Sequence, residues 1–324
     1  MRVGLVGAGV ISHNHLPHLL RLGAEVRVYS EAGADDLVAA HGGTVAASLD
    51  ELLDWAQVAD LASPTHTHYP LARQALAAGL DVICEKPLAR TDEQAAELVS
   101  LARQSGHHLY PNHVVRYFPA YARLRDAVRD GRLGDLAVLR FYRSGAFPVR
   151  SAWFADLDLS GGVVLDMMLH DLDLARWVAG EVTEVSATRS RRGEGQHPAE
   201  ASHVLLTHAS GAVTQVSGVW GAQHLRFTTG YFAAGTGGTL EYDRAAESGF
   251  TADLARRPAR GEAVPETDPA EDPYFLTLRD FLDAIRNGTP TRVTAADGAA
   301  AVRIANAALR SAREGQPVTL AAAP

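Results

Sequence analysis

Short apolar runs alternate with segments of helical periodicity along the first 120 residues of the chain. This alternation is typical of a doubly wound α/β sheet, in which helices connect parallel strands. The first strand starts almost at the N-terminus and breaks into glycines. Further elements are predicted as strands at residues 25–29, 58–62, 80–84 and 109–111, and as helices at residues 70–79 and after Thr91.

The pattern changes after residue 120. One helix is predicted over residues 121–130, and strand-like runs separated by turn residues follow as far as residue 242. Few helices interrupt these runs, which favours an open, mainly antiparallel sheet. A segment rich in proline and charge, residues 256–272, is predicted as an exposed loop, and two helices at residues 274–287 and 295–313 close the chain. We therefore predict two domains, residues 1–120 and 121–324.

Length and composition fit a globular protein of two domains. The chain has 324 residues, more than a single hydrophobic core usually supports. It is 47% hydrophobic and 21% charged, which is ordinary for such a protein. The net charge of −8 argues against a nucleic-acid partner. No apolar stretch approaches the roughly 20 residues that span a bilayer, so we expect no membrane partner and a cytoplasmic location.

Cysteine and histidine usage makes a structural metal improbable. Cys84 is the only cysteine, so no disulfide can form within the chain. No set of cysteines and histidines has the spacing of zinc ligands. Three histidines crowd the first helix, His13, His15 and His18, but we find no carboxylate near them in the sequence. We interpret them as packing residues or as neighbours of a bound phosphate, and we predict no metal.

A glycine-rich turn follows the first strand. Gly7 permits a tight turn from strand to helix, and Gly9 lets the backbone approach a pyrophosphate. The free N–H groups at the start of the next helix then face that anion. Ser12 occupies the third position, where Gly or Ala is usual, and Val10 and Ile11 lie between. These five residues are predicted to bind a dinucleotide, so the N-terminal domain is predicted to be a Rossmann domain; the alternative is a plain glycine turn.

The end of the second strand bears on the choice of cofactor. Ser30 and Glu31 lie about 20 residues beyond the glycine turn, where an acidic side chain would bind the ribose hydroxyls of NAD. A serine at the key position would not repel the 2′-phosphate of NADP. No arginine lies just after Glu31, which weakens the case for NADP. Both cofactors stay open, with NAD slightly favoured.

A lysine follows the apolar run that ends at Cys84. In open parallel sheets, ligands bind outside the carboxyl ends of the strands. Lys86, in the tripeptide Glu85-Lys86-Pro87, is therefore a candidate catalytic residue. The alternative is a solvated loop lysine.

A second candidate site lies on a predicted helix that begins after Gly161-Gly162. At about 100° per residue, Asp166, His170 and Asp173 fall on one narrow stripe with apolar residues on both sides. A solvated face would be broader and richer in lysine and glutamate. The stripe therefore favours a carboxylate and an imidazole that line a cleft, where the carboxylate orients the histidine. A surface pair at positions i and i+4 is the alternative.

Together these motifs resemble the Gfo/Idh/MocA oxidoreductases over nearly the whole chain. Glu85-Lys86-Pro87 matches the family's signature, and the order and spacing of the remaining motifs agree with it. Two positions depart from the family pattern: Thr65 replaces the usual Asn, and Asn112 replaces the usual Gly. The other matching segments are Gly7-x-Gly9-x-x-Ser12-x-x-His15, Pro64-Thr65-His66-Thr67-His68, Asn112-His113-Val114-Val115-Arg116, Gly161-Gly162 through Asp166 and His170, and residues 308–313.

The resemblance implies an NAD(P)-dependent oxidoreductase with its active site between the two domains. It would transfer a hydride between nicotinamide and a carbinol or ketone carbon of a sugar, inositol or related polyol. Lys86, Asp166 and His170 match the family's catalytic positions. We assign His170 as the proton acceptor in alcohol oxidation, Asp166 as its orienting partner, and Lys86 as the cation that binds the substrate oxygen. The roles of Lys86 and His170 are exchangeable at this stage.

The resemblance also implies further binding residues. Candidate cofactor contacts beyond the glycine turn are Ser63, Pro64, Thr65, His68, Glu85 and Lys86. Candidate substrate contacts are His113, Arg116, Arg150 and Trp153, because aromatic faces pack on sugar C–H surfaces and polar groups bind hydroxyls. Trp153 is alternatively a core residue, and Arg150 a surface residue.

Two other functions are open. Some members of the family are redox-assisted glycosidases that use bound NAD without net turnover. A non-catalytic sensor that binds a dinucleotide is the other alternative, and the intact set of Lys86, Asp166 and His170 argues against it. By analogy with the family, the open sheet is expected to pair with another subunit, giving a homodimer or homotetramer.

Overall fold

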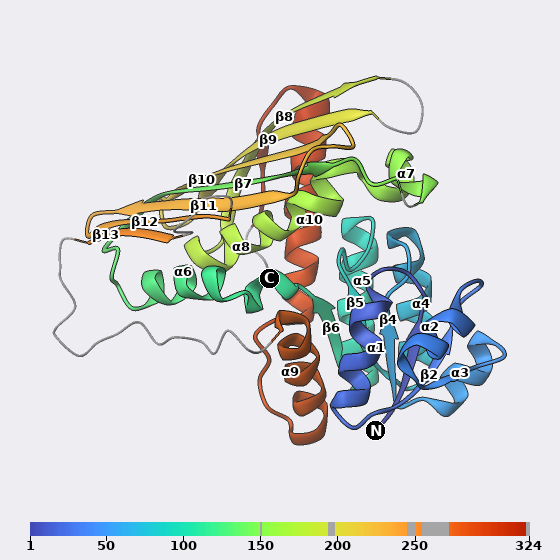
Figure 1. Cartoon of the computed structure of the whole chain (residues 1–324). Coiled ribbons are helices and arrows are strands. Elements are labelled where there is room, and N and C mark those ends of the chain that lie inside the picture. The colour runs from blue at the N-terminus through green and yellow to red at the C-terminus, as the bar shows by residue number, and fades with distance from the viewer. Residues whose placement is uncertain (150, 194–197, 245–249, 255–271, 322–324) are drawn as a thin grey trace. The chain divides into compact units, whose positions relative to one another are not determined.

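The computed structural model describes residues 1–149, 151–193, 198–244, 250–254 and 272–321 (Figure 1). The chain forms two compact units. The first comprises Met1–Tyr117 and Ala270–Val302, and the second comprises Phe118–Pro269 and Arg303–Pro324. The change of unit at residue 118 lies close to the boundary predicted at residue 120. The C-terminal segment differs from the prediction, because part of it returns to pack with the N-terminal unit.

The first unit is built on a six-stranded parallel sheet with the strand order β3-β2-β1-β4-β5-β6. This topology confirms the predicted doubly wound sheet. The two-residue edge strand β3 was not anticipated, since so short a run has no periodicity of its own. The strands are β1 (Arg2–Val6), β2 (Glu25–Tyr29), β3 (Thr44–Val45), β4 (Val58–Leu61), β5 (Asp81–Glu85) and β6 (Leu109–Asn112). The helices are α1 (Ser12–Arg21), α2 (Ala34–His41), α3 (Leu49–Trp55), α4 (Thr65–Ala77), α5 (Asp92–Ser105), the 3-10 helix η1 (Val114–Tyr117), α9 (Pro273–Asn287) and the start of α10 (Ala295–Glu314).

Alternate residues of each strand enter two different hydrophobic cores, because side chains along a strand point to opposite faces. Val58, Ile83 and Tyr110 pack into the core that contains the apolar residues of α1, α2 and α9. Ala59 and Val82 pack into the other core, which contains those of α3, α4 and α5. The sheet is therefore covered by helices on both faces, as parallel strands require.

Helix α4 begins earlier than predicted. The sequence placed its start at Pro70, but the helix covers Thr65–Ala77 and keeps Pro70 inside. Proline is a good first residue of a helix, and that preference misled the prediction. The cap of α5 was predicted correctly, since the Thr91 hydroxyl accepts a hydrogen bond from the backbone N–H of Gln94 at 3.3 Å.

The second unit contains an eight-stranded sheet with the order β13-β12-β11-β7-β10-β9-β8-β14. Among the described strand pairs of this second sheet, only β7–β10 is parallel, which confirms the prediction of a mainly antiparallel sheet. The strands are β7 (Leu136–Ala146), β8 (Val182–Arg192), β9 (Ala199–His208), β10 (Val213–Gly221), β11 (Thr228–Gly235), β12 (Gly238–Asp243), β13 (Phe250–Leu254) and β14 (Val318–Thr319). The helices are α6 (Pro119–Arg129), the 3-10 helix η2 (Ala152–Ala155), α7 (Leu157–Ser160), the π-helix η3 (Val164–Met168) and α8 (Leu169–Ala179), together with the end of α10.

The loop predicted at residues 256–272 lies outside the described residues except for Asp272. The Asp272 carboxylate caps α9 by accepting a hydrogen bond from the Tyr274 N–H at 2.8 Å. None of the helices in the described part of the chain is both long and apolar enough to cross a bilayer.

Candidate active site

The glycine turn after β1 has the geometry of an anion-binding turn. Gly7 has φ of +112°, and a Cβ there would lie 2.4 Å from the carbonyl oxygen of Ala62. A Cβ on Gly9 would meet nothing within 4 Å, so this position is open to a ligand. Ser12 begins α1 and is fully buried, and its Oγ has no hydrogen-bond partner among the described residues. With the free N–H groups of a helix start, this turn fits a pyrophosphate.

The loop after β2 lies beside the glycine turn. The Gly7 N–H donates to the carbonyl oxygen of Tyr29 at 2.8 Å, and a Cβ added to Gly33 would lie 3.5 Å from the Ala8 Cβ. Ser30 is half-buried and Glu31 is exposed. The two residues expected to bind the ribose therefore lie on the same edge of the sheet as the glycine turn.

His68 joins the turns that follow β4 and β5. Its ring is 1% exposed, with Nδ1 2.7 Å from the Pro87 carbonyl oxygen and Nε2 2.8 Å from the Ser63 carbonyl oxygen. Burial lowers the pKa of the His68 ring, and its contacts with the two backbone carbonyl oxygens act in the opposite direction. The ring thus holds two turns of the protein together. Its contact with the cofactor stays a prediction. Of its neighbours, Thr65 is buried and Pro64 is exposed.

Lys86 directly follows the last residue of β5 and is half-buried. The peptide bond between Lys86 and Pro87 is cis. Lys86 is the only lysine in the sequence. The structure places this candidate lysine just after the carboxyl end of β5, an inner strand of the sheet, at the end of the sheet that carries the glycine turn.

Below this edge lies a buried polar network that sequence reasoning missed. His15 Nδ1 lies 2.9 Å from Asp60 Oδ2, and His15 Nε2 lies 3.3 Å from Glu85 Oε1. The Asn112 side-chain amide donates to Glu85 Oε1 at 2.6 Å. The expectation that no carboxylate lies near the first-helix histidines was wrong for His15, since both partners come from distant strands. His18 is likewise 3.4 Å from Asp272 Oδ2.

Electrostatics fixes the charges in this network. Burial by itself would lower the pKa of His15, but the charges and hydrogen bonds of Asp60 and Glu85 outweigh it and raise the pKa to about 10. Burial would likewise raise the pKa of Glu85, and the hydrogen bond and charge of His15 reverse this and lower it. His15 is therefore an imidazolium near neutral pH, and Glu85 is a carboxylate.

The strand periodicity could have revealed this network. Asp60, Glu85 and Asn112 have the same parity as Val58, Ile83 and Tyr110, which face α1. They lie at the carboxyl ends of three adjacent strands, and Glu85 and Asn112 are paired in the register of β5 and β6. A buried polar network is therefore indicated where polar residues occupy the strand positions that face the core, opposite a histidine of the covering helix.

Two of the predicted substrate contacts are deeply buried. His113 and Arg116 are each 1% exposed. Arg116 Nη1 donates to the Arg292 carbonyl oxygen at 3.1 Å and lies 3.3 Å from Asp297 Oδ2, while Arg292 Nη1 donates to the Arg116 carbonyl oxygen at 2.9 Å. These contacts attach the segment after β6 to the start of α10. They give Arg116 a structural role that its position in the sequence did not show.

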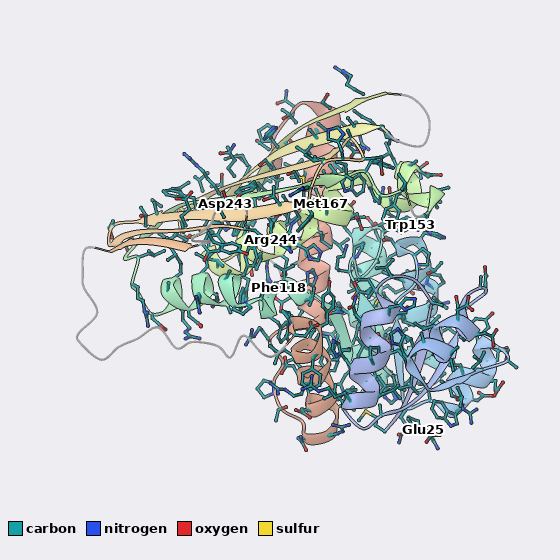
Figure 2. The ribbon with its side chains drawn as sticks, in the orientation of Figure 1. Glu25, Phe118, Trp153, Met167, Asp243 and Arg244 are labelled. Atoms are coloured by element: carbon teal, nitrogen blue, oxygen red, sulfur yellow. The ribbon has the colours of Figure 1, made fainter. Side chains whose placement is uncertain are left out.

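The other two predicted substrate contacts belong to the second unit. Trp153, labelled in Figure 2, lies in η2 and is half-buried. Its ring stacks on Phe154, with the ring centroids 3.9 Å apart. Arg150 lies outside the described residues.

The segment that carries Asp166 and His170 is buried along almost its whole length. From Gly161 to Ala175 every residue is buried except these two, which are half-buried. Asp173, expected on the same stripe, is only 2% exposed. Of the three residues of the predicted stripe, only the Asp166 carboxylate and the His170 imidazole therefore keep exposed surface.

The helix differs from the prediction in one respect. The sequence reasoning assumed 100° per residue, but Val164–Met168 form a π-helix, whose wider turns change that rotation. Packing against β10 accommodates this widened turn. A Cβ on Gly218 of β10 would lie 2.2 Å from the Met168 Cγ, so the glycine provides the space for Met168.

Two buried ion pairs fix the ends of this segment. At its start, Glu200 Oε1 accepts hydrogen bonds from the Val163 N–H and the Arg189 Nε, each at 3.0 Å. One residue after His170, Asp171 binds Arg143 of β7 in a bidentate pair at 2.8 and 3.1 Å. Burial would lower the pKa of Arg143, but Asp171 outweighs it and raises that pKa. The helix is therefore attached to the sheet on both sides of Asp166 and His170.

Comparison with known proteins defines the class. Residues 1–113 match the oxidoreductase family with an NAD-binding Rossmann fold, and residues 121–241 match the GFO/IDH/MocA C-terminal domain. The chain therefore belongs to the GFO/IDH/MocA family of oxidoreductases, and its N-terminal unit is an NAD-binding domain. Among the described residues, no group of three or more His, Cys, Asp or Glu side chains is arranged to hold a metal ion.

Individual relatives are similar over almost their full length. The 1,5-anhydro-D-fructose reductase of Ensifer adhaerens is 30% identical, over 97% of this chain and 97% of that protein. Inositol 2-dehydrogenase 1 of Saccharopolyspora erythraea is also 30% identical, over 98% of this chain and 96% of that protein. The crystal structure of GenD2 from gentamicin A biosynthesis in complex with NAD matches with a TM-score of 0.85 at 26% identity, over 99% of this chain and 97% of that one.

Proposed function

We propose that this chain is an NAD-dependent dehydrogenase or reductase that acts at a carbinol or ketone carbon of a sugar, inositol or related polyol. The observation that carries the proposal is the pair Asp166 and His170, which alone keep exposed surface on an otherwise buried helix segment. Lys86, half-buried at the end of β5, supplies a cation. Relatives named as reductases and dehydrogenases of sugars and inositol support this substrate class.

Residues of the first unit fit the cofactor. The glycine turn would hold the pyrophosphate through Gly9, Val10, Ile11 and the buried Ser12 hydroxyl. The segment from Ser63 to Thr65, at the same sheet edge, and the backbone beside Glu85 would complete the site. When bound, NAD supplies the nicotinamide carbon that exchanges a hydride with the substrate.

Three side chains are proposed to handle the substrate oxygen. His170 accepts the hydroxyl proton during oxidation and returns it during reduction, since an imidazole titrates near neutral pH. Asp166 shares its helix face and orients it. Lys86 binds the same oxygen and stabilises the negative charge that develops there. The exchange of roles between Lys86 and His170 is decided by their pH–rate profiles. His113 and Trp153 are retained as candidate sugar contacts.

Glu31 is proposed to favour NAD over NADP. An exposed carboxylate at this position accepts hydrogen bonds from ribose hydroxyls and repels a 2′-phosphate. Replacing Glu31 with Gln should lower the ratio of kcat/KM for NAD over NADP about 10-fold, because one charge repulsion is removed. An unchanged ratio would assign the preference to Ser30 or to the backbone.

The decisive experiment is a screen of sugars and polyols with NAD and NADP in parallel, followed by nicotinamide absorbance. We expect turnover of at least one polyol or sugar with NAD. Sugar release from a glycoside without accumulation of reduced nicotinamide would instead support the glycosidase. Tight cofactor binding with no turnover on any substrate would support the sensor.

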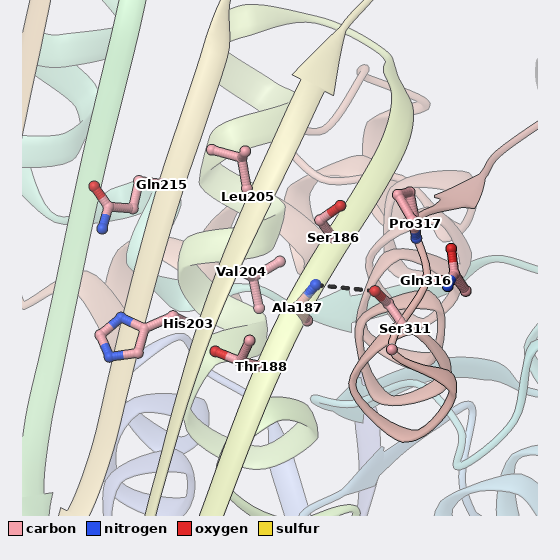
Figure 3. A pocket seen from close by; sticks show the side chains of 11 residues that line it. Ser186, Ala187, Thr188, His203, Val204, Leu205, Gln215, Ser311, Gln316 and Pro317 are labelled. Carbon is pink, nitrogen blue, oxygen red and sulfur yellow. Dashed lines mark hydrogen bonds between the residues drawn. The ribbon is translucent and has the colours of Figure 1, made fainter.

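We also propose that the exposed face of the C-terminal sheet joins subunits into a homodimer or homotetramer in the cytoplasm. A surface groove of about 490 Å³ lies on β8, β9 and β10 beside the end of α10 (Figure 3). Leu205, which lines it, is 47% exposed. Replacing Leu205 with Glu should weaken association in light scattering. A monomeric wild-type protein would contradict the proposal.

A further inference from the structure

We propose that His15 is a positioning residue for Lys86: as a buried cation between Asp60 and Glu85 it neutralises the Glu85 carboxylate, so that the Lys86 ammonium stays directed at the substrate oxygen. This inference rests on the role proposed above for Lys86. It assigns a task to a histidine that makes no contact with the reacting atoms in the proposed reaction.

Geometry is the first support. The four side chains of the network come from four different elements, α1, β4, β5 and β6, and meet in one buried site. His15, Asp60 and Asn112 are 0% exposed, and Glu85 is 7% exposed. The His15 ring bridges the two carboxylates, at 2.9 Å from Asp60 and 3.3 Å from Glu85. A ring held on both sides has little freedom to move.

Charge balance is the second support. Two buried carboxylates repel each other and need a cation near them, because an unpaired buried charge is costly. Two cations act on Glu85: His15, which comes from α1, and Lys86, which is the next residue in the sequence. Both lower the pKa of Glu85. Without His15, the carboxylate would attract the Lys86 ammonium more strongly. The lysine would then be drawn away from the substrate.

The remaining neighbours cannot replace His15. His68, on the other side of the Lys86 turn, contacts two backbone carbonyl oxygens, and burial lowers its pKa, whereas the pKa of His15 is raised. Cys84 is buried, and burial together with Glu85 and Asp60 raises the pKa of its thiol, which stays uncharged. Among the described residues packed around Glu85, His15 is therefore the cation that does not belong to the proposed active site.

Asn112 is a feature of this chain in the same network. The family pattern has glycine at this position, whereas here the side-chain amide donates to Glu85 Oε1 at 2.6 Å. Glu85 and Asn112 are also register partners of β5 and β6. The Asn112 Nδ2 also lies 3.1 Å from His15 Nε2, so Asn112→Gly removes contacts with both Glu85 and His15 while the His15 side chain is kept.

The sequence offers a direct probe, because Lys86 is its only lysine. Reductive methylation with isotope-labelled formaldehyde gives one lysine signal in NMR, separate from that of the N-terminal amine. In His15→Gln we expect the titration midpoint of this signal to rise by about 1 pH unit, because an unneutralised carboxylate stabilises the ammonium. In Asn112→Gly we expect a smaller shift, and in the double variant His15→Gln/Glu85→Gln a return toward wild type.

The matched control lies at the other end of β5. His108 Nδ1 pairs with Asp81 Oδ1 at 2.9 Å, but the His108 side chain is 47% exposed. His108→Gln makes the same chemical change in a histidine–carboxylate pair on the same strand and should leave the Lys86 midpoint unchanged. A shift in His108→Gln equal to that in His15→Gln would overturn the inference.

Kinetics completes the test. His15→Gln should lower kcat about 10- to 100-fold, with the dissociation constant of NAD changed less than about 3-fold, since a misplaced group costs rate more than binding. The difference in kcat between wild type and His15→Gln should shrink as the pH falls and Glu85 becomes protonated. A deficit that is equal at every pH, or an unchanged Lys86 midpoint in His15→Gln and Asn112→Gly alike, would reduce His15 to a structural residue. A wild type without turnover would contradict the proposed function, whereas the NMR titration would still test the positioning role.

Discussion

The protein contains two histidine–carboxylate arrangements in opposite surroundings. In the first unit, His15 is fully buried between Asp60 and Glu85. In the second, Asp166 and His170 are the two half-buried residues of an otherwise buried helix segment. Burial with paired charges fixes a protonation state, whereas exposure lets a group exchange protons with a ligand or water. In the roles proposed here, the extent of burial separates the positioning histidine, His15, from the catalytic one, His170.

The largest expected effect on activity comes from the half-buried histidine of the second unit. His170→Ala should lower kcat about 10²- to 10⁴-fold, the usual contribution of a general acid–base group. Its unfolding free energy should change little, because the side chain is only half-buried. Steady-state kinetics and urea unfolding of the same preparation measure both. A large loss of stability with kcat preserved would place His170 with the structural residues.

The buried ion pair next to it should show the reverse behaviour. Asp171→Ala leaves the Arg143 guanidinium, 6% exposed, without its bidentate partner. We expect a loss of about 3–5 kcal/mol in unfolding free energy, the usual cost of breaking a buried pair. The double variant Arg143→Leu/Asp171→Leu should recover part of it. Equal losses in the single and double variants would show that leaving Arg143 unpaired adds no cost beyond the loss of the pair itself.

The His15 network should make stability depend on pH. The pKa of His15 is 6.5 in the unfolded chain and about 10 in the folded protein. Its contribution is therefore fully present below pH 6.5 and is lost as the pH rises through 10, on the order of 5 kcal/mol. Thermal unfolding of wild type and His15→Gln across this window measures the difference. Parallel pH dependences in the two proteins would mean that His15 is not charged in the fold.

Packing of the π-helix gives a smaller effect. Gly218→Ala places a Cβ against Met168, and we expect a loss of about 1–3 kcal/mol from overpacking. Because Met168 adjoins the helix that carries His170, kcat should fall as well. Met168→Ala in the Gly218→Ala background should relieve the contact. An additive loss in the double variant would argue against a steric origin.

The smallest effect is expected at an exposed pair. Arg73 and Glu97 are 63% and 50% exposed, with Arg73 Nε 3.3 Å from Glu97 Oε1. Arg73→Ala should change the unfolding free energy by less than about 0.5 kcal/mol, because solvent and salt screen such pairs. Urea unfolding at low and high salt measures it. A loss as large as that of Asp171→Ala would break the distinction between buried and exposed charges.

Local patterns were enough for the elements and their order. The alternation of apolar runs predicted the parallel sheet, and the Thr91 cap and the position of Lys86 after β5 followed from adjacent residues. Periodicity also singled out Asp166 and His170, the two half-buried residues of this segment. In these cases the interactions that determine the structure join residues that are close in the sequence.

Features that depend on distant partners were missed. The π-helix requires the space left by Gly218 on β10, and no local signal marks it. The contacts of Arg116 with Arg292 and Asp297 were not anticipated, because these partners come from the far end of the chain. His15 was separated from Asp60 and Glu85 for the same reason. Its network was nevertheless accessible through the strand parity.

The pH dependence of kcat/KM for oxidation of a substrate from the screen, compared between wild type and His170→Ala, tests the central claim most directly. In the wild type, activity should fall at acid pH as the proton acceptor becomes protonated, with a slope of one. We predict that His170→Ala loses this acid limb and keeps a low activity that is independent of pH in the same range. An acid limb that persists unchanged in His170→Ala would contradict the assignment and give the proton transfer to Lys86.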